Sequence, residues 1–139
     1  MKKVVSLVTI FLLCLTALAG CSGSKEVDLK TVLSDINSKY SLDLKELTDS
    51  NDLKKYYSID TEDVKQFAAE INSDSNSRVE IVLVEAVDAD AASRVNDALS
   101  KTYTSIVTQY SGYNAKKLPM VEACKVTQDG NYVTMIVAD

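Results

Sequence analysis

The sequence has 139 residues, with 15 basic and 20 acidic side chains, a formal net charge of −5 and no histidine. An acidic surplus without a cluster of Lys and Arg argues against a nucleic-acid-binding protein, because phosphates are bound by such clusters. The lack of histidine removes the commonest general base and imidazole ligand, so Ser–His and Cys–His catalytic pairs and a zinc site are excluded.

Residues 1–20 have the layout of a secretory signal peptide. A short positive region, Met1-Lys2-Lys3, precedes an uncharged apolar stretch over residues 4–17. As a membrane span, residues 4–19 fall short of the roughly 20 apolar residues that a bilayer requires. We therefore expect residues 1–20 to be an export signal that the mature protein lacks.

The end of this stretch, Leu18-Ala19-Gly20-Cys21, resembles the lipobox of bacterial lipoproteins. The resemblance implies cleavage between Gly20 and Cys21 and a diacylglyceryl group on the Cys21 thiol. Two or three acyl chains, each contributing about 0.8 kcal/mol per buried methylene, anchor a protein stably. The expected location is the outer face of the cytoplasmic membrane, with the lipid on Cys21 as the contact to it.

The predicted mature chain has an anchor, a short tether and one domain. Residues 21–26 comprise the lipidated cysteine and the tether Ser22-Gly23-Ser24-Lys25-Glu26, which reaches at most about 17 Å at about 3.3–3.6 Å per residue. Residues 27–139 are enough for a single core. Loss of Lys2 and Lys3 leaves 13 basic against 20 acidic residues, or −7. An anionic membrane should not attract such a domain.

Two helices are expected first in the domain. Apolar residues at spacings of three and four predict a helix over residues 27–40, with Asp28 as N-cap and a staple between Val27 and Val32. Residues 42–47 are ambiguous between an extended and a helical form. A second, short helix is capped by Asp49 or Ser50 and ends near Tyr57.

A strand and a turn follow. Residues 64–71 fit a strand or a helix by pattern alone, and residues 73–77 form a polar turn. Residues 78–87 are rich in β-branched side chains, which predicts a strand in a central, well covered position.

The last part is predicted as one long helix and two strands. Asp88 or Asp90 caps a helix to about Tyr110, which Gly112 ends in a left-handed conformation. Strands over residues 118–127 and 132–138 flank a hairpin turn at Asp129-Gly130. Cys124 falls within the first of these strands, which favours a buried, inert thiol.

The predicted fold class is therefore α+β. We expect a small antiparallel sheet of about four strands packed on one long helix, with one or two N-terminal helices.

From about residue 53 to residue 137 the chain resembles a family of lipoprotein domains from Gram-positive bacteria, the domain-of-unknown-function family numbered 4358. The segments behind this are residues 53–60, the strand at 79–84 with the helix after it, and Lys125-Val126 with Gly130-Asn131-Tyr132-Val133. The family tends to have Gly where this chain has Ser58, so a left-handed Ser58 would cost on the order of 1 kcal/mol. The resemblance implies a lipoprotein architecture and supplies no activity or catalytic residue.

Five carboxylates crowd the region around the second helix: Asp49, Asp52, Asp60, Glu62 and Asp63. Paired carboxylates hydrolyse glycosides or bind calcium, whereas caps and solvated surface are the ordinary interpretation. The segment departs from a calcium loop, with Lys54 where Gly is needed and Asp60 in the last place. We therefore expect no metal here.

Four tyrosines, Tyr56, Tyr57, Tyr110 and Tyr113, are candidates for a ligand surface. Tyr56 and Tyr57 can stack on a sugar or a peptide, although packing of the second helix onto the core is the favoured interpretation. Glycine-rich phosphate loops are absent from a chain with only four glycines, which disfavours a nucleotide ligand.

Three functions remain open. The leading hypothesis is a membrane-anchored, non-enzymatic binding or interaction module without a cofactor, whose partner is a protein or cell-wall material. The alternatives are a carboxylate-dependent cell-wall hydrolase that uses acids between Asp49 and Asp63, and an accessory subunit of a membrane complex.

Overall fold

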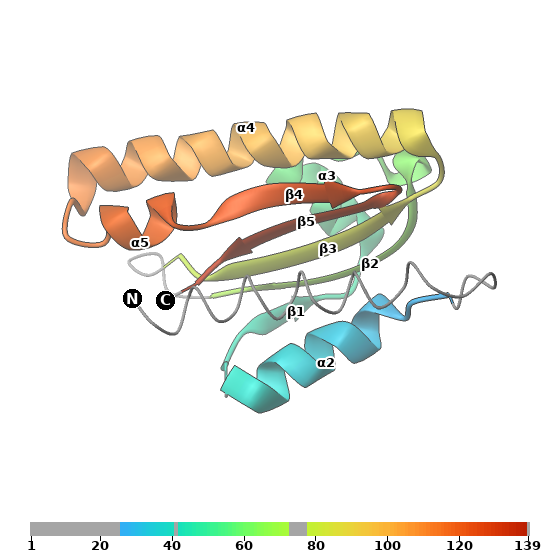
Figure 1. Cartoon of the computed structure of the whole chain (residues 1–139), viewed down its shortest axis with the longest axis horizontal. Coiled ribbons are helices and arrows are strands. Elements are labelled where there is room, and N and C mark those ends of the chain that lie inside the picture. Colours follow the sequence, from blue (N-terminus) through green and yellow to red (C-terminus); the bar gives the residue numbers. More distant parts are fainter. Residues whose placement is uncertain (1–25, 41, 73–77, 139) are drawn as a thin grey trace.

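The computed structural model describes residues 26–40, 42–72 and 78–138 (Figure 1). The predicted export signal, Cys21, tether residues 22–25 and the predicted turn at 73–77 lie outside the described residues. The elements in chain order are α2 (Leu29–Tyr40), β1 (Lys45–Leu47), α3 (Ser50–Tyr57), η1 (Thr61–Asp63), β2 (Val64–Ile71), β3 (Glu80–Ala86), α4 (Ala89–Tyr113), α5 (Leu118–Glu122), β4 (Lys125–Asp129) and β5 (Tyr132–Val137).

The strands form one antiparallel sheet in the order β1-β2-β3-β5-β4. The α+β class, the packing on one long helix and the two N-terminal helices are confirmed. The sheet has five strands rather than about four, because β1 forms within the segment whose pattern was ambiguous. Residues 64–71 are a strand, the form that their alternation left open.

Strand β3 lies at the centre, and all seven of its residues are buried. Its side chains alternate between two cores, since successive residues of a strand point to opposite faces. Val82 and Val84 pack with α3 and α4, whereas Ile81 and Leu83 pack with α2. Figure 1 shows α4 along one side of the sheet and α2 along the other. We call these sides the α4 face and the α2 face.

Aspartate side chains cap three helices, as the sequence predicts. Asp28 accepts from the N–H of Lys30 (3.0 Å), Asp49 from that of Asn51 (2.9 Å) and Asp88 from that of Ala91 (2.7 Å). Each bond satisfies a backbone donor that has no partner within its helix. The caps are thus Asp49 rather than Ser50, and Asp88 rather than Asp90.

The predicted strand over residues 118–127 is wrong in its first half. Leu118–Glu122 is the helix α5, which carries Pro at its start and buries Val121, and the strand begins at Lys125. Proline has no N–H to offer a sheet but fits the first turn of a helix. The Tyr103 hydroxyl donates to the carbonyls of Val121 and Cys124, which holds α5 against α4. Cys124 therefore precedes β4 and is only half-buried.

The predicted end of the long helix is also wrong. Helix α4 runs to Tyr113 and includes Gly112, and Asn114 ends it with a φ of −148°. The left-handed glycine is instead Gly130, whose φ is 56°. It occupies the first place of the two-residue loop of the β4–β5 hairpin, the place that a type II′ turn reserves for Gly.

The domain has two distinct ends. At one end, which we call the tether end, the Val27 carbonyl accepts from Gln66, and Gln66 pairs with Glu85 near the beginning of α4. At the opposite end, α4 finishes over the beginning of β3, where the Tyr110 hydroxyl accepts from the N–H of Arg78 (2.7 Å). None of the described helices is long and apolar enough to cross a bilayer.

Candidate functional site

A groove of about 470 Å³ lies between the end of α3 and the middle of α4, and we call it the α3–α4 groove. Segment 57–63 forms one wall, and one face of α4 forms the other. Its lining residues are Tyr57, Ser58, Ile59, Asp60, Asp63, Arg94, Val95, Asp97, Ala98, Lys101, Thr102 and Ser105. The polar and charged side chains outnumber the apolar ones, so a ligand in the groove would meet charges of both signs beside the apolar side chains of Ile59, Val95 and Ala98.

The wall beside α3 is held in place by buried contacts. Tyr57 is 2% exposed, and its hydroxyl donates to Glu80 (3.1 Å), which also binds the Arg78 guanidinium. Burial, followed by the nearby Glu80 charge, raises the pKa of Tyr57 far above the ordinary range, so the phenol stays protonated. The next residue, Ser58, is left-handed with a φ of 58°, and its N–H closes α3 on the Lys54 carbonyl (3.0 Å).

Three of the five charged side chains that line the groove, Asp60, Asp63 and Arg94, are held in ion pairs. The Arg94 guanidinium donates to both carboxylate oxygens of Asp63, at 2.6 and 3.0 Å, and this contact lowers the pKa of Asp63. Asp60 accepts from Lys54 at 2.8 Å on the exposed rim. A carboxylate that is neutralised by a cation is a poor general acid, because the pair favours its charged form. The hydroxyls of Thr102 and Ser105 donate to helix carbonyls of α4.

The structure does not bring the four candidate tyrosines into one surface. Tyr57 lines the groove, while Tyr110 is buried at the other end of α4 with its hydroxyl bound to Arg78. Tyr56 is 40% exposed, with Lys55 over its ring at 4.9 Å, and Tyr113 is 91% exposed. Of these four residues, only Tyr57 is placed to contribute to the groove.

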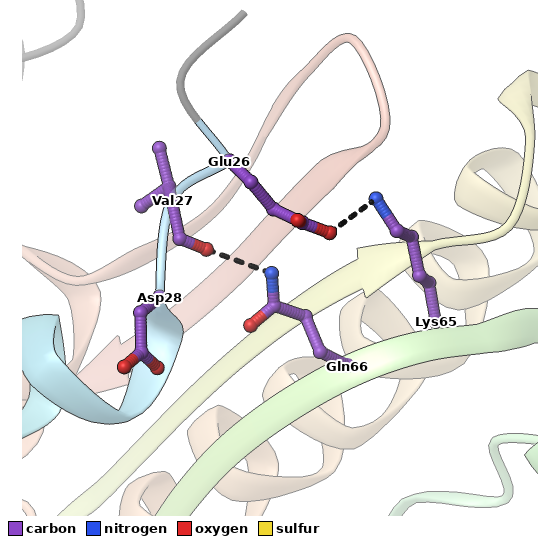
Figure 2. Close-up of a pocket in the computed structure, with 5 residues that line it drawn as sticks. All are labelled: Glu26, Val27, Asp28, Lys65 and Gln66. Atoms are coloured by element: carbon purple, nitrogen blue, oxygen red, sulfur yellow. Dashed lines mark hydrogen bonds and ion pairs between the residues drawn. The ribbon is translucent and has the colours of Figure 1, made fainter.

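A second hollow, of about 370 Å³, lies where the chain enters the domain and is lined by Glu26, Val27, Asp28, Lys65 and Gln66. Figure 2 shows Gln66 and Lys65 reaching from β2 toward this entering segment. Gln66 donates to the Val27 carbonyl (2.7 Å), and Lys65 forms an ion pair with Glu26 (3.1 Å). The hollow is thus part of the attachment of the entering segment.

Buried Glu85 on β3 holds the two β2 side chains that make this attachment. It accepts from Gln66 and, at 2.9 Å, from Lys65. Burial acts to raise the pKa of Glu85, but these hydrogen bonds outweigh burial and lower it. The sequence analysis missed Glu80 and Glu85, although carboxylates within an otherwise apolar strand are a signal of buried polar contacts.

The family model of Domain of unknown function (DUF4358) matches residues 37–138. The chain belongs to this family. The match extends the resemblance found from residue 53 back to the last turn of α2, and it includes every strand of the DUF4358 fold and the whole α3–α4 groove. The searches of curated proteins and of solved structures each returned no match for this DUF4358 chain.

The DUF4358 domain therefore offers a polar groove on the α4 face and a firmly attached entering segment on the α2 face. Among its described residues no group of His, Cys, Asp and Glu is arranged to hold a metal ion. The groove has charged side chains of both signs beside a wall that buried contacts hold in place. Such an arrangement can bind a ligand through charge and hydrogen bonds.

Proposed function

We propose that this DUF4358 protein is an exported lipoprotein, anchored by lipid on Cys21 at the outer face of the cytoplasmic membrane, whose domain is a non-enzymatic binding or interaction module. The observation that carries the proposal is the lipobox pattern Leu18-Ala19-Gly20-Cys21 placed immediately before a domain whose first described residues are bound to the sheet.

The contacts of the entering segment support a short distance between lipid and domain. Because Glu26 and Val27 are tied to Lys65 and Gln66, only residues 22–25 separate Cys21 from the folded part. An extended chain from residue 21 to residue 26 spans at most about 17 Å. The domain would then act within reach of lipid headgroups, and not at the end of a long stalk.

The charged contacts of the groove support a binding role. Asp63 and Asp60, the groove carboxylates from the segment that the hydrolase alternative would use, are bound by Arg94 and Lys54. The sequence has no histidine to serve as a base in their place. We assign the α3–α4 groove as the surface on which a polar partner would bind.

The anchor is tested by feeding the bacteria a labelled fatty acid and comparing the wild-type protein with Cys21→Ala. We expect label in the wild type, none in the variant, and release of the variant from the membrane fraction. Cys124→Ala is the matched control, and it should be labelled as the wild type is. Equal and negligible label in all three proteins would refute the anchor.

The binding role is tested by incubating the purified protein with a panel of peptide, glycan and ester substrates. We expect no turnover above the blank. Turnover that disappears in Asp63→Asn or Asp60→Asn would refute the proposal and would identify a carboxylate-dependent hydrolase. Turnover that survives both substitutions would also refute it.

A further inference from the structure

Strand β4 is an edge of the sheet, and its outer backbone groups face away from the fold. Among the described strands it pairs only with β5, and Asp129 and Tyr132 flank the two-residue loop between the two strands. The Asn131 carbonyl accepts from the N–H of Ala86 on β3. Since the backbone groups of successive residues in a strand point to opposite sides, Tyr132 and every second residue after it bond to β4 instead. It follows that the N–H and C=O groups of Val126 and Gln128 point outward. No hydrogen bond from the described part of the chain reaches them.

Apart from its short length and its two terminal charges, this edge has none of the usual protection against pairing with another strand. Natural edges are blunted by proline, by bulges or by a charge within the strand. Strand β4 has no proline, and it pairs with β5 over all five residues without a shift of register. Its two charges, Lys125 and Asp129, stand at opposite ends. Both are exposed, and neither forms an ion pair within residues 26–40, 42–72 and 78–138.

We propose that β4 is an interaction surface for a second copy of this chain, which adds its own β4 antiparallel to the first about a twofold axis at Thr127. The two five-stranded sheets would then continue into one sheet of ten strands.

The hydrogen-bond pattern and the charges select the register. Residues whose N–H and C=O groups point outward must pair with such residues of the other copy. The twofold axis therefore lies at Val126, Thr127 or Gln128. An axis at Thr127 pairs all five residues and places Val126 opposite Gln128 of the other copy, with four backbone hydrogen bonds. It also places Lys125 opposite Asp129, in a pair whose side chains are close enough to attract each other. The other two axes lose both pairs of charges.

The pairing leaves each face of the joined sheet covered by the same helices in both copies. The axis is perpendicular to the sheet, so both α4 helices lie on one side of the joined sheet and both α2 helices on the other. The entering segment is attached on the α2 face, where Gln66 and Glu85 hold Val27. Both tethers therefore leave from the same side and can reach the same membrane. This last step rests on the proposed anchor at Cys21.

A membrane would strengthen a contact of this size. An interface of one strand pair is far smaller than that of a stable soluble dimer. Anchoring both copies to one surface raises their effective concentration, which favours pairing without any new contact. We therefore expect the pair to form in the membrane and to be weak in dilute solution.

The test is disulfide cross-linking of the full chain in membranes, with Cys124 replaced by Ser in every variant. Thr127→Cys places two thiols across the axis, at a cross-strand spacing that a disulfide accepts. We expect most of this variant to run at twice the chain's mass without reductant. Thr104→Cys, exposed on α4, is the matched control and should remain a single chain, as should the Cys124→Ser parent.

A mixed experiment tests the register. Lys125→Cys and Asp129→Cys should each cross-link poorly when expressed alone, and efficiently when expressed together, because each faces the other across the axis. Equal cross-linking of Thr127→Cys and Thr104→Cys would overturn the proposal. A cross-linked product of any mass other than twice the chain would overturn the second copy as the partner.

Exchanging the charges of Lys125 and Asp129 distinguishes a loss of pairing from a loss of folding. In the Thr127→Cys chain, Lys125→Glu should lower the cross-linked fraction at least about fivefold, and adding Asp129→Lys should restore it. Lys116→Glu makes the same charge change away from β4 and should have no effect. Failure of the double exchange to restore cross-linking would contradict the paired charges.

The two proposals fail separately. Fatty-acid labelling without cross-linking would refute only the strand pairing. Cross-linking without labelling would refute only the anchor.

Discussion

Ser58 holds a backbone conformation that costs free energy. Its φ of 58° and ψ of 28° lie in the left-handed region, where a side chain is crowded by its own carbonyl. The contacts around it explain why the conformation persists, since its N–H closes α3 on Leu53 and Lys54 and its neighbours Tyr57 and Ile59 are buried. Ser58 is therefore left-handed at the place where the family tends to have glycine, the residue that adopts this conformation most readily.

Replacing Ser58 by Gly should raise the free energy of unfolding by about 0.5–1 kcal/mol, because glycine adopts a positive φ without a steric cost. Urea unfolding of Ser58→Gly, Ser58→Ala and the wild type measures this. The alanine control keeps the crowded Cβ and should give no gain. A glycine variant with the midpoint of the wild type would contradict the assignment of strain.

Glu85 should make the domain sensitive to acid. Its pKa in the folded state is lowered by Gln66 and Lys65, against the effect of burial. A carboxyl whose pKa is lower folded than unfolded stabilises the protein above its unfolded pKa of about 4.3. This stability is lost as the pH falls through the folded pKa.

Glu85→Gln should lower the urea midpoint at pH 7, because half-exposed Lys65 loses a charged partner that is buried in the sheet. The same variant should lose less stability than the wild type between pH 5 and pH 3, since it has no carboxyl to titrate there. Glu46→Gln, on exposed β1, is the control and should follow the wild type. Equal acid losses in all three proteins would contradict the role of Glu85.

At the scale of elements, α4 depends on its first turn. Asp88 accepts the N–H of Ala91 at 2.7 Å, while Asp90 lies within the helix without capping it. Asp88→Ala should lower the free energy of unfolding by about 1 kcal/mol. Asp90→Ala changes the same charge in the same turn and should cost less, and denaturant melts of both variants measure the difference. A larger loss in Asp90→Ala would show that charge, and not the cap, stabilises this end.

At the scale of the whole molecule, the attachment of the entering segment sets where the chain leaves the domain. Gln66 holds this segment twice, by donating to the Val27 carbonyl and accepting from the N–H of Leu29. Gln66→Leu removes both bonds and leaves Glu85 with one partner fewer. We expect trypsin to cleave this variant faster after Lys30, and mass spectrometry measures the rate of cleavage. Gln109→Leu, on exposed α4, is the control, and equal cleavage rates would contradict the attachment.

The sequence by itself determined the local features. Three aspartates predicted the caps of α2, α3 and α4, the apolar run predicted the central strand β3, and Asp129-Gly130 predicted the hairpin. Each depends on neighbouring residues alone: a carboxylate beside open N–H groups, a continuous apolar run, or a glycine with positive φ. Such signals act over a few residues and can be seen without the fold.

Tertiary structure decided the rest. The apolar pattern of Leu118–Glu122 fits a strand as well as a helix; Pro119 is a local signal for the helix, and the contact of Val121 with α4 holds it in place. Residues 64–71 form a strand because β1 and β3 flank them. The α3–α4 groove brings segment 57–63 beside residues 94–105 of α4, and β4 is an edge only because β5 returns beside β3. Contacts of this range depend on which elements pack together, which no local pattern encodes.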